Sequence, residues 1–269
     1  MNFIDSHCHL AAFAREGSLE AVLGRAAGVG VVAMVCVGTE PEDWALYREL
    51  VRQQRGVLYY TVGLHPCSVG QGWREAVAAL PAYFERDLRP VAIGEIGLDY
   101  FHLPKDEAAA EAVKAEQRAA FRFQLELART LGTQVVVHSR KSFFDCVREI
   151  DASGVDWRRV VFHCFSEGPE AMRELNRRGG RGSFTGILTY PNARSIPAAA
   201  VEQGIERFML ETDAPYLSPQ AVRGLRNEPA HLVHTAAAAA HFFGVSVEAL
   251  AAAATRATRE FFGLGSDLL

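Results

Sequence analysis

The feature that most constrains the fold is a regular alternation of short β-branched segments with longer helical segments. Eight short segments of this kind occur within 269 residues. The alternation is typical of parallel strands covered by helices. The eight predicted strands are Asn2 to Ser6, Val31 to Val37, Val57 to Val62, Val91 to Gly94, Gln134 to Val137, Val160 to Phe162, Arg181 to Phe184 and Phe208 to Glu211.

Two of the intervening helices carry clear signals. The helix predicted from Pro41 to Gln54 is expected to begin at a capping box of Thr39 and Glu42 and to be closed by Gly56. The longest helix is predicted from Glu107 to Leu131. Its apolar residues recur at i, i+4 and i+7, which predicts one stripe buried against the sheet, made of Phe121, Leu125 and Ala128.

Eight strands alternating with helices favour a (β/α)8 TIM-type barrel that forms a single domain over residues 1–269. No linker and no internal repeat divides the chain. A doubly wound open sheet is the alternative, because periodicity does not show whether a sheet closes on itself.

Composition narrows the functional classes. The sequence leaves no room for a signal peptide before its first motif and has no apolar run near the ~20 residues of a membrane span, which predicts a cytoplasmic protein with no membrane association. The formal net charge of −4 argues against a broad basic face for duplex nucleic acid. Five cysteines without a C-x-x-C motif favour reduced thiols. No obligate protein partner is inferred.

The chain opens with a motif that suggests metal binding, Asp5-Ser6-His7-Cys8-His9. Side chains two apart in a strand point to the same face, so Asp5, His7 and His9 are expected on one side and the other two residues on the opposite side. Two imidazoles on one face can bind a metal ion. An isolated pair of histidines at this spacing is more often packed in the core or exposed. Whether His7 and His9 bind a metal ion therefore depends on ligands elsewhere in the chain.

Polar residues recur where the predicted strands end. In a barrel the carboxyl ends of the strands meet at one face, where the active site of this fold is built. The strand-terminating residues are His7 and His9 after the first strand, His65 after the third, Glu95 after the fourth, His138 after the fifth, His163 after the sixth and Asp213 after the eighth. The remaining histidines are interpreted as structural or surface residues: His102, His231, His234 and His241.

This set of imidazoles and carboxylates suits one or two divalent ions such as zinc, manganese or magnesium. Glu95 lies in the middle of the set and is predicted to bridge two ions about 3.5 to 4 Å apart, the separation used in two-metal hydrolysis. Water bound to such an ion can have its pKa lowered towards about 7. The predicted reaction class is therefore hydrolysis.

The motifs also resemble those of a known family, the TatD-like metal-dependent deoxyribonucleases of the amidohydrolase superfamily. The resemblance spans positions 3 to 231. The matching pieces are FIDSHCHL, VGLHP, AIGEIGLDY, the helix positions Gln117, Phe121, Gln124 and Leu125, then VVVHSR, VFHCFS, LETDAPYL and RNEPAHL. One departure is Glu167, which interrupts the usual HCFSG sequence.

The resemblance implies a TIM-type barrel that hydrolyses phosphodiester bonds of DNA, often at the 3′ ends of single strands. It implies a first metal held by His7, His9, Glu95 and Asp213, and a second held by Glu95, His138 and His163. Glu95 and Asp213 are the expected catalytic residues. Contacts with substrate phosphate are predicted for residues on or near the loops, although exposed arginines are more often only solvated: His65, Arg140 and Arg226.

Two other functions stay open on the sequence alone. An amidohydrolase or esterase acting on a small molecule would use the same metals and the same activated water. A non-catalytic metal-binding protein could retain the barrel. For Asp213, the alternative to proton transfer is a role as ligand only or as a helix N-cap before Ala214 and Pro215.

Overall fold

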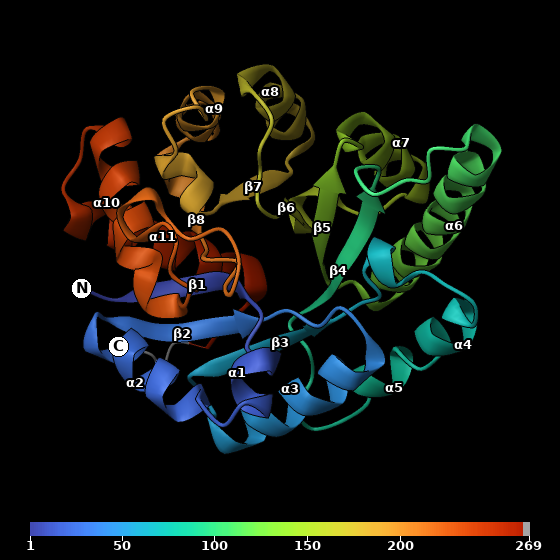
Figure 1. Cartoon of the computed structure of the whole chain (residues 1–269), viewed down its shortest axis with the longest axis horizontal. Helices are drawn as coiled ribbons and strands as arrows, with labels where there is room; N and C mark the ends of the chain where they lie inside the picture. The colour runs from blue at the N-terminus through green and yellow to red at the C-terminus, as the bar shows by residue number, and fades with distance from the viewer. Residues whose placement is uncertain (266–269) are drawn as a thin grey trace.

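The computed structural model describes residues 1–265. Eight parallel strands form one sheet in the order β1 to β8, and helices surround it (Figure 1). Every predicted strand is present. The strands are β1 Phe3–Cys8, β2 Val31–Cys36, β3 Leu58–Val62, β4 Ala92–Asp99, β5 Gln134–Arg140, β6 Val160–Phe162, β7 Arg181–Phe184 and β8 Met209–Leu210.

The sheet closes between β8 and β1. The Asp213 amide donates a hydrogen bond to the His7 carbonyl at 2.9 Å, and the His9 amide donates to the Ala214 carbonyl at 2.7 Å. These bonds join the segment after the last strand to the first strand. The predicted TIM-type barrel is therefore confirmed, and the open sheet is wrong.

The helices lie outside the strands and follow them in sequence (Figure 1). They are α1 Ala11–Arg15, α2 Leu19–Gly28, α3 Pro41–Gln53, α4 Trp73–Ala78, α5 Pro81–Phe84, α6 Glu107–Leu131, α7 Phe143–Ser153, α8 Pro169–Arg178, α9 Ser195–Gln203, α10 Leu232–Phe243 and α11 Val247–Phe262.

The predicted capping box of α3 is wrong. The N-cap residue is Glu40, without a side-chain capping bond, and Pro41 occupies the first turn. Thr39 lies one residue too early to cap and instead donates its hydroxyl to the Asp43 carboxylate at 2.9 Å. Proline fixes the helical φ at this position and needs no amide partner, so the helix can begin without a capping side chain. The helix ends at Gln53, ahead of the predicted glycine.

Helix α6 holds two segments of the barrel through buried glutamines. Its predicted apolar stripe is buried, and two amides share that face. Gln124 accepts a hydrogen bond from the Leu64 amide at 2.7 Å and donates to the Leu64 carbonyl at 3.2 Å. Gln117 makes the same pair of bonds with Asp99, at 3.0 and 3.2 Å. Buried backbone groups need partners, so these side chains fix the loop after β3 and the end of β4.

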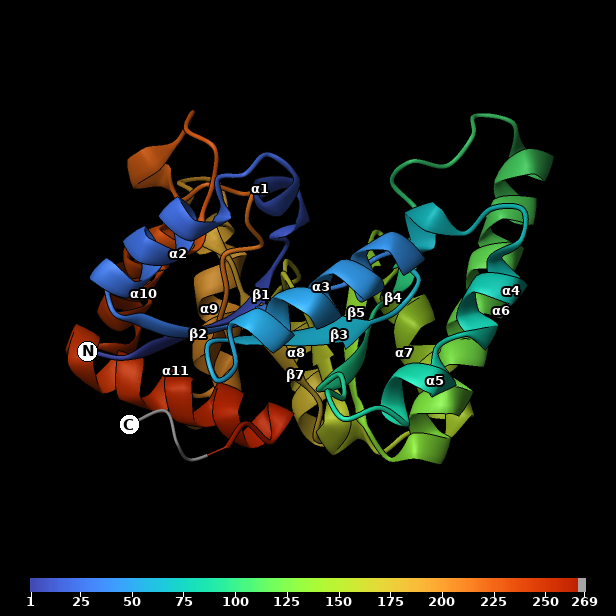
Figure 2. The same cartoon turned by 90° about the horizontal axis from the view of Figure 1, so that it is seen from below.

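The amino-terminal end of the barrel is filled. Interior side chains such as Ile4, Val35 and Met209 form one buried cluster with Phe261 and Phe262 of α11. Figure 2 shows α11 across the lower end of the strands, with the loops after β4 and β8 above the upper end. A cavity is therefore left at the carboxyl ends of the strands.

No single described helix has the length and apolar composition to cross a membrane. Two helical segments, Pro229–Phe243 and Val247–Phe262, meet the criterion only as a pair bent by 105°, by length and composition alone.

Candidate metal centre and active site

The predicted ligands converge at the floor of a cavity of about 700 Å³ at the carboxyl ends of the strands. Glu95 lies at their centre, and each of its two carboxylate oxygens faces a different group of side chains. The structure brings together all six predicted ligands: His7, His9, Glu95, His138, His163 and Asp213.

The first group surrounds Glu95 Oε2. His7 Nε2 lies 3.4 Å from this oxygen and His9 Nε2 lies 3.7 Å from it. The same two nitrogens lie 3.6 and 3.2 Å from Asp213 Oδ1. Two imidazole nitrogens and two carboxylate oxygens thus face a common point, as the sequence predicts for the first metal.

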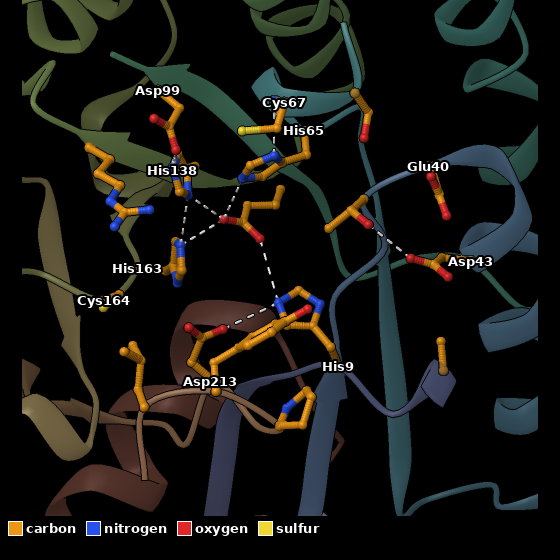
Figure 3. Close-up of a pocket in the computed structure, with 18 of the residues that line it drawn as sticks. His9, Glu40, Asp43, His65, Cys67, Asp99, His138, His163, Cys164 and Asp213 are labelled. Carbon is orange, nitrogen blue, oxygen red and sulfur yellow. Dashed lines mark hydrogen bonds and ion pairs between the residues drawn. The ribbon is translucent and has the colours of Figure 1, made fainter. Parts of the chain in front are cut away.

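The second group surrounds Glu95 Oε1. His138 Nδ1 and His163 Nε2 each lie 2.7 Å from this oxygen. His65 Nε2 lies 3.5 Å from it (Figure 3). The two groups therefore share one carboxylate, which is the arrangement expected of a bridging ligand.

The donor set fits a cation. His9 donates its Nδ1–H to the Val37 carbonyl at 3.0 Å, so its Nε2 carries a lone pair in the neutral ring. That lone pair faces the oxygens of Asp213 and Glu95, and His7 Nε2 is only 3.2 Å away. Lone pairs directed at one another repel, and a bound cation converts this repulsion into coordination. Donation of the other ring N–H to a backbone carbonyl is also typical of metal-binding histidines.

The carboxylates of the centre are ionised. Burial opposes the charge of Glu95, but His163, His65 and His138 hold its pKa well below the usual range. Burial likewise opposes the charge of Asp213, and the neighbouring imidazoles of His9, His163 and His7 lower its pKa. Both groups are therefore anionic at neutral pH, as carboxylate ligands must be.

Two further carboxylates contact the ligand histidines, and sequence reasoning missed both. Asp99 Oδ2 lies 3.0 Å from His138 Nε2. Glu211 Oε1 lies 3.6 Å from His163 Nδ1, and its two oxygens accept bonds from the Cys164 amide at 2.6 Å and the Ser183 hydroxyl at 2.5 Å. Carboxylates in these places orient metal-binding imidazoles. The available signals were the second acid in AIGEIGLDY and the first in LETD.

His65 is held as a hydrogen-bond donor. Its Nδ1 accepts a bond from the Cys67 amide at 3.1 Å, which leaves the proton of the neutral ring on Nε2. Burial lowers the pKa of His65, so the ring is neutral. The Nε2–H therefore points to the metal centre as a donor and lacks the lone pair that a ligand needs.

The two predicted arginines differ in placement. Arg140 lines the cavity, and its Nη1 lies 3.2 Å from Nε2 of His102, which also lines the cavity. Arg226 is not among the residues that line the cavity, and its Nη1 pairs with Glu16 Oε2 at 2.6 Å. Only Arg140 is thus brought to the predicted metal ligands.

The predicted alternation of the first strand fails at its start. Asp5 lies away from the metal centre and accepts hydrogen bonds from the Thr212 amide at 3.0 Å and hydroxyl at 2.5 Å. Ser6, expected on the other face, donates to Glu211 at 3.5 Å. The pairing with β2 is irregular between Asp5 and Cys8, which explains the failure. Cys8 does face away, with its thiol 3.6 Å from the Val35 carbonyl.

Alternation along a strand through His163 would turn the next residue, Cys164, away from the ligands, but the structure places Cys164 in the lining of the cavity. Strand β6 ends at Phe162, so alternation no longer applies two residues later. Its thiol lies 3.6 Å from the Thr185 hydroxyl. Glu95, expected after the fourth strand, lies inside β4, whose pairing with β5 is irregular between Ile93 and Ile96.

Strained backbone is concentrated around this cavity. Among residues 1–265, four non-glycine residues have a left-handed φ, and all four follow β5, β6 or β8. Such conformations cost of order 1–3 kcal/mol each and tend to persist at functional sites. The four are Lys141 at 56°, Cys164 at 45°, Asp213 at 54° and Leu217 at 56°.

Comparisons with known proteins agree with this geometry. A family model described as TatD related DNase matches residues 4–263. The uncharacterized metal-dependent hydrolase YcfH of Escherichia coli is 31% identical over 279 residues, covering 100% of this chain and 98% of that protein. The 3′-5′ ssDNA/RNA exonuclease TatD of Citrobacter koseri is 31% identical over 252 residues, covering 90% of this chain and 92% of that protein.

A solved structure shows the same architecture. The crystal structure of YJJV, a TatD homologue from Escherichia coli, matches with a TM-score of 0.87 and 28% identity, over 98% of both chains. The family match and the relatives both extend over nearly the whole chain. The chain therefore belongs to the TatD related DNase family, and it is a metal-dependent hydrolase on a TIM-type barrel.

Proposed function

We propose that the protein hydrolyses phosphodiester bonds of nucleic acid, removing nucleotides from the 3′ ends of single-stranded DNA. The proposal is supported chiefly by the position of Glu95, because each of its two carboxylate oxygens faces a separate group of imidazoles. The name of the Citrobacter koseri relative, 31% identical, supports the choice of nucleic acid.

The proposal assigns two divalent cations to the centre, zinc, manganese or magnesium. The first would be held by His7, His9, Asp213 and Glu95 Oε2, and the second by Glu95 Oε1, His138 and His163. When bound, such cations acidify an attacking water and stabilise charge that develops on a phosphate. The residues around them bind the substrate, orient it and move the proton.

Asp213 is the proposed proton acceptor. Its Oδ1 faces His7 and His9, and its side chain is nearly buried beside the point where the attacking water must lie. A positioned base of this kind contributes about 10² to 10⁴ in rate. No helix begins at Asp213, so a role as helix N-cap is wrong. The proton taken from water then passes to the leaving oxygen.

His65 and Arg140 are the proposed contacts to phosphate. The Nε2–H of His65 faces the Glu95 side of the cavity and can donate to a phosphate oxygen. Arg140 has no carboxylate within ion-pair distance among residues 1–265, so its charge is available to the substrate. Arg226 stays a predicted contact, and its pairing with Glu16 must break for it to reach a phosphate.

A small amide or ester is the second candidate, and one observation favours it. Glu40 and Asp43 line the side of the cavity next to β2 (Figure 3). Burial and the charges of Asp43 and Glu42 raise the pKa of Glu40. Asp43 pairs with Arg15 at 3.0 Å, which leaves Glu40 as the acid of this side without an ion pair among residues 1–265. An uncompensated acid disfavours a polyanion, whereas a neutral or cationic substrate would tolerate it.

One assay separates these functions. Metal-loaded protein is incubated with single-stranded DNA labelled at either the 5′ or the 3′ end, and in parallel with a panel of amides and carboxylic esters. We expect release of mononucleotides from the 3′ end. Hydrolysis of an amide or ester, with DNA left intact, would overturn the proposal in favour of the second candidate.

A further inference from the structure

We propose that the two nucleobases that flank the scissile phosphate stack on aromatic platforms at opposite sides of the cavity mouth. One platform is the pair Phe101 and Arg140, and the other is Tyr216. This inference rests on the proposed function and specifies which part of the substrate is recognised. It predicts a preference for unpaired bases of any sequence.

The first platform lies where β4 and β5 end. Phe101 is 47% exposed, and the guanidinium carbon of Arg140 lies 3.7 Å from its ring centroid. The ammonium group of Lys141 lies 4.9 Å from the same ring. In the part of the chain that the structure describes, neither cation pairs with a carboxylate. An aromatic ring and a guanidinium plane both stack on bases, and the free charges suit the adjoining phosphates.

The second platform lies in the loop after β8. Tyr216 is 61% exposed, lines the cavity and has its ring centroid 6.0 Å from that of His9. Its backbone is fixed, because its amide donates to the Asp213 carbonyl at 2.9 Å and its carbonyl accepts from the Asn227 amide group at 2.5 Å. A rigid loop thus presents an exposed ring beside a predicted metal ligand.

The two platforms face each other across the metal centre. In a closed barrel with strand order β1 to β8, the fourth and eighth strands lie on opposite sides. Figure 2 shows the loop after β4, in green, and the loop after β8, in orange, rising on opposite sides of the upper end. A phosphate bound near Glu95 would therefore have one neighbouring nucleoside directed towards each platform.

Exposed aromatic residues need no explanation singly, since much of any protein surface is apolar. Phe144, for instance, is 64% exposed, and neither it nor Phe101 is among the residues that line the cavity. Phe101 adjoins the lining through the guanidinium of Arg140, 3.7 Å from its ring centroid, and the ring of His102, whose centroid lies 4.9 Å away. The platforms differ from Phe144 because each adjoins a residue with a left-handed φ of 56°, Lys141 next to Arg140 and Leu217 next to Tyr216. Strain of this kind is retained where a defined loop shape is required.

The test combines protein variants with base-deleted substrates. Short single strands carry an abasic tetrahydrofuran residue on the 5′ or the 3′ side of the terminal phosphodiester. We expect each deletion to lower kcat/KM of the wild-type protein by about five- to 150-fold, the range for one stacked base. In Phe101→Ala or Tyr216→Ala, deleting the base that uses the missing platform should cause no further loss. Each platform should interact with only one of the two bases, either the one on the 5′ side or the one on the 3′ side of the phosphodiester.

Five variants serve as controls. Phe144→Ala should leave the effect of both base deletions as large as in the wild type. Phe101→Tyr and Tyr216→Phe should retain the coupling, because stacking requires the ring and not the hydroxyl. Phe101→Leu and Tyr216→Leu keep an apolar side chain at each position and should lose the coupling, which separates stacking from general apolar contact.

A binding measurement gives a second readout. The affinity of the metal-loaded protein for a phosphorothioate single strand that resists cleavage is measured by fluorescence anisotropy, with and without each base. If the loss of binding free energy on combining a variant with a base deletion equals the sum of the two separate losses, the ring and the base do not interact. That result would overturn the stacking proposal even if DNA is cleaved. Failure to cleave any phosphodiester would instead overturn the proposed function.

Discussion

The imidazole of His138 is anchored by Asp99, whose Oδ2 lies 3.0 Å from Nε2 of the ring. The other ring nitrogen is thereby directed to Glu95, at 2.7 Å. Asp99 is itself fixed, because Gln117 binds its backbone and its second oxygen accepts the Phe101 amide at 2.8 Å. Helix α6 therefore acts on a predicted metal ligand through a chain of three hydrogen-bonded residues.

Asp99→Asn should lower the affinity for the second cation about 10- to 100-fold, the usual effect of removing a carboxylate that orients a metal ligand. Isothermal titration of the metal-free protein with zinc measures this directly. Asp106→Asn is a matched control, since asparagine also caps the start of α6 and the site lies outside the cavity. Equal zinc affinity in Asp99→Asn and wild type would exclude the orienting role.

Glu95→Gln should lower the affinity for both cations together, because a neutral amide is a poor bridging ligand. His138→Ala should mainly weaken the binding of the second cation, because of the two Glu95 oxygens its ring faces only Oε1. Elemental analysis after dialysis against graded metal concentrations gives the two stoichiometries. A Glu95→Gln protein that retains two ions with unchanged affinity would show that this carboxylate is no bridge.

Asp213→Asn should reduce kcat by about 10² to 10⁴ with little change in substrate affinity, because the amide keeps the shape and one oxygen but accepts no proton. Steady-state kinetics at increasing metal concentrations distinguish the two roles of this residue. Recovery of near wild-type activity at saturating metal would reduce Asp213 to a ligand only.

Cys8→Ser and Cys164→Ser should retain full metal content and most activity. Burial raises the pKa of the Cys164 thiol to about 12 and raises that of Cys8 well above its usual value. Both thiols are therefore protonated at neutral pH, whereas metal binding requires the thiolate. Loss of bound metal from either folded variant would contradict this assignment.

Gln124→Leu should destabilise the fold and displace His65. The change removes both hydrogen bonds to Leu64 and leaves a buried amide and carbonyl without partners, at a cost of about 1–3 kcal/mol for each group. Urea unfolding measures the loss, and Gln53→Leu on the exposed face of α3 is the control. A stability equal to that of the control would show that water replaces the glutamine.

The strands and the six ligands could be predicted because both depend on local patterns. A β-branched run predicts a strand, and a polar residue at its end predicts a place on the active face of the barrel. Glu95 was found by this reasoning although it lies inside β4. Its irregular pairing with β5 turns it towards the centre, and no sequence period reports such an irregularity.

The residues that orient the ligands were missed for a different reason. The motifs AIGEIGLDY and LETD each contain two acidic residues, and the position of a strand end indicates only one of them as a ligand. Asp99 and Glu211 are the acids that this pattern does not indicate. Their roles depend on contacts with histidines 39 and 48 positions away, since Asp99 reaches His138 and Glu211 reaches His163. Likewise, the pairing of Arg226 with Glu16 spans 210 positions and could not be read from the motif.

Helix α11, which fills the amino-terminal end of the barrel, has a consequence for turnover. Among residues 1–265 the side chains of the buried cluster around α11 leave the cavity no rear exit, so a product released at its floor leaves through the mouth by which the substrate entered. For a strand shortened one nucleotide at a time, the released product lies between the new end and the metal centre until it diffuses out. For the proposed exonuclease, the filled end of the barrel therefore favours dissociation of the strand between successive cuts over continuous sliding.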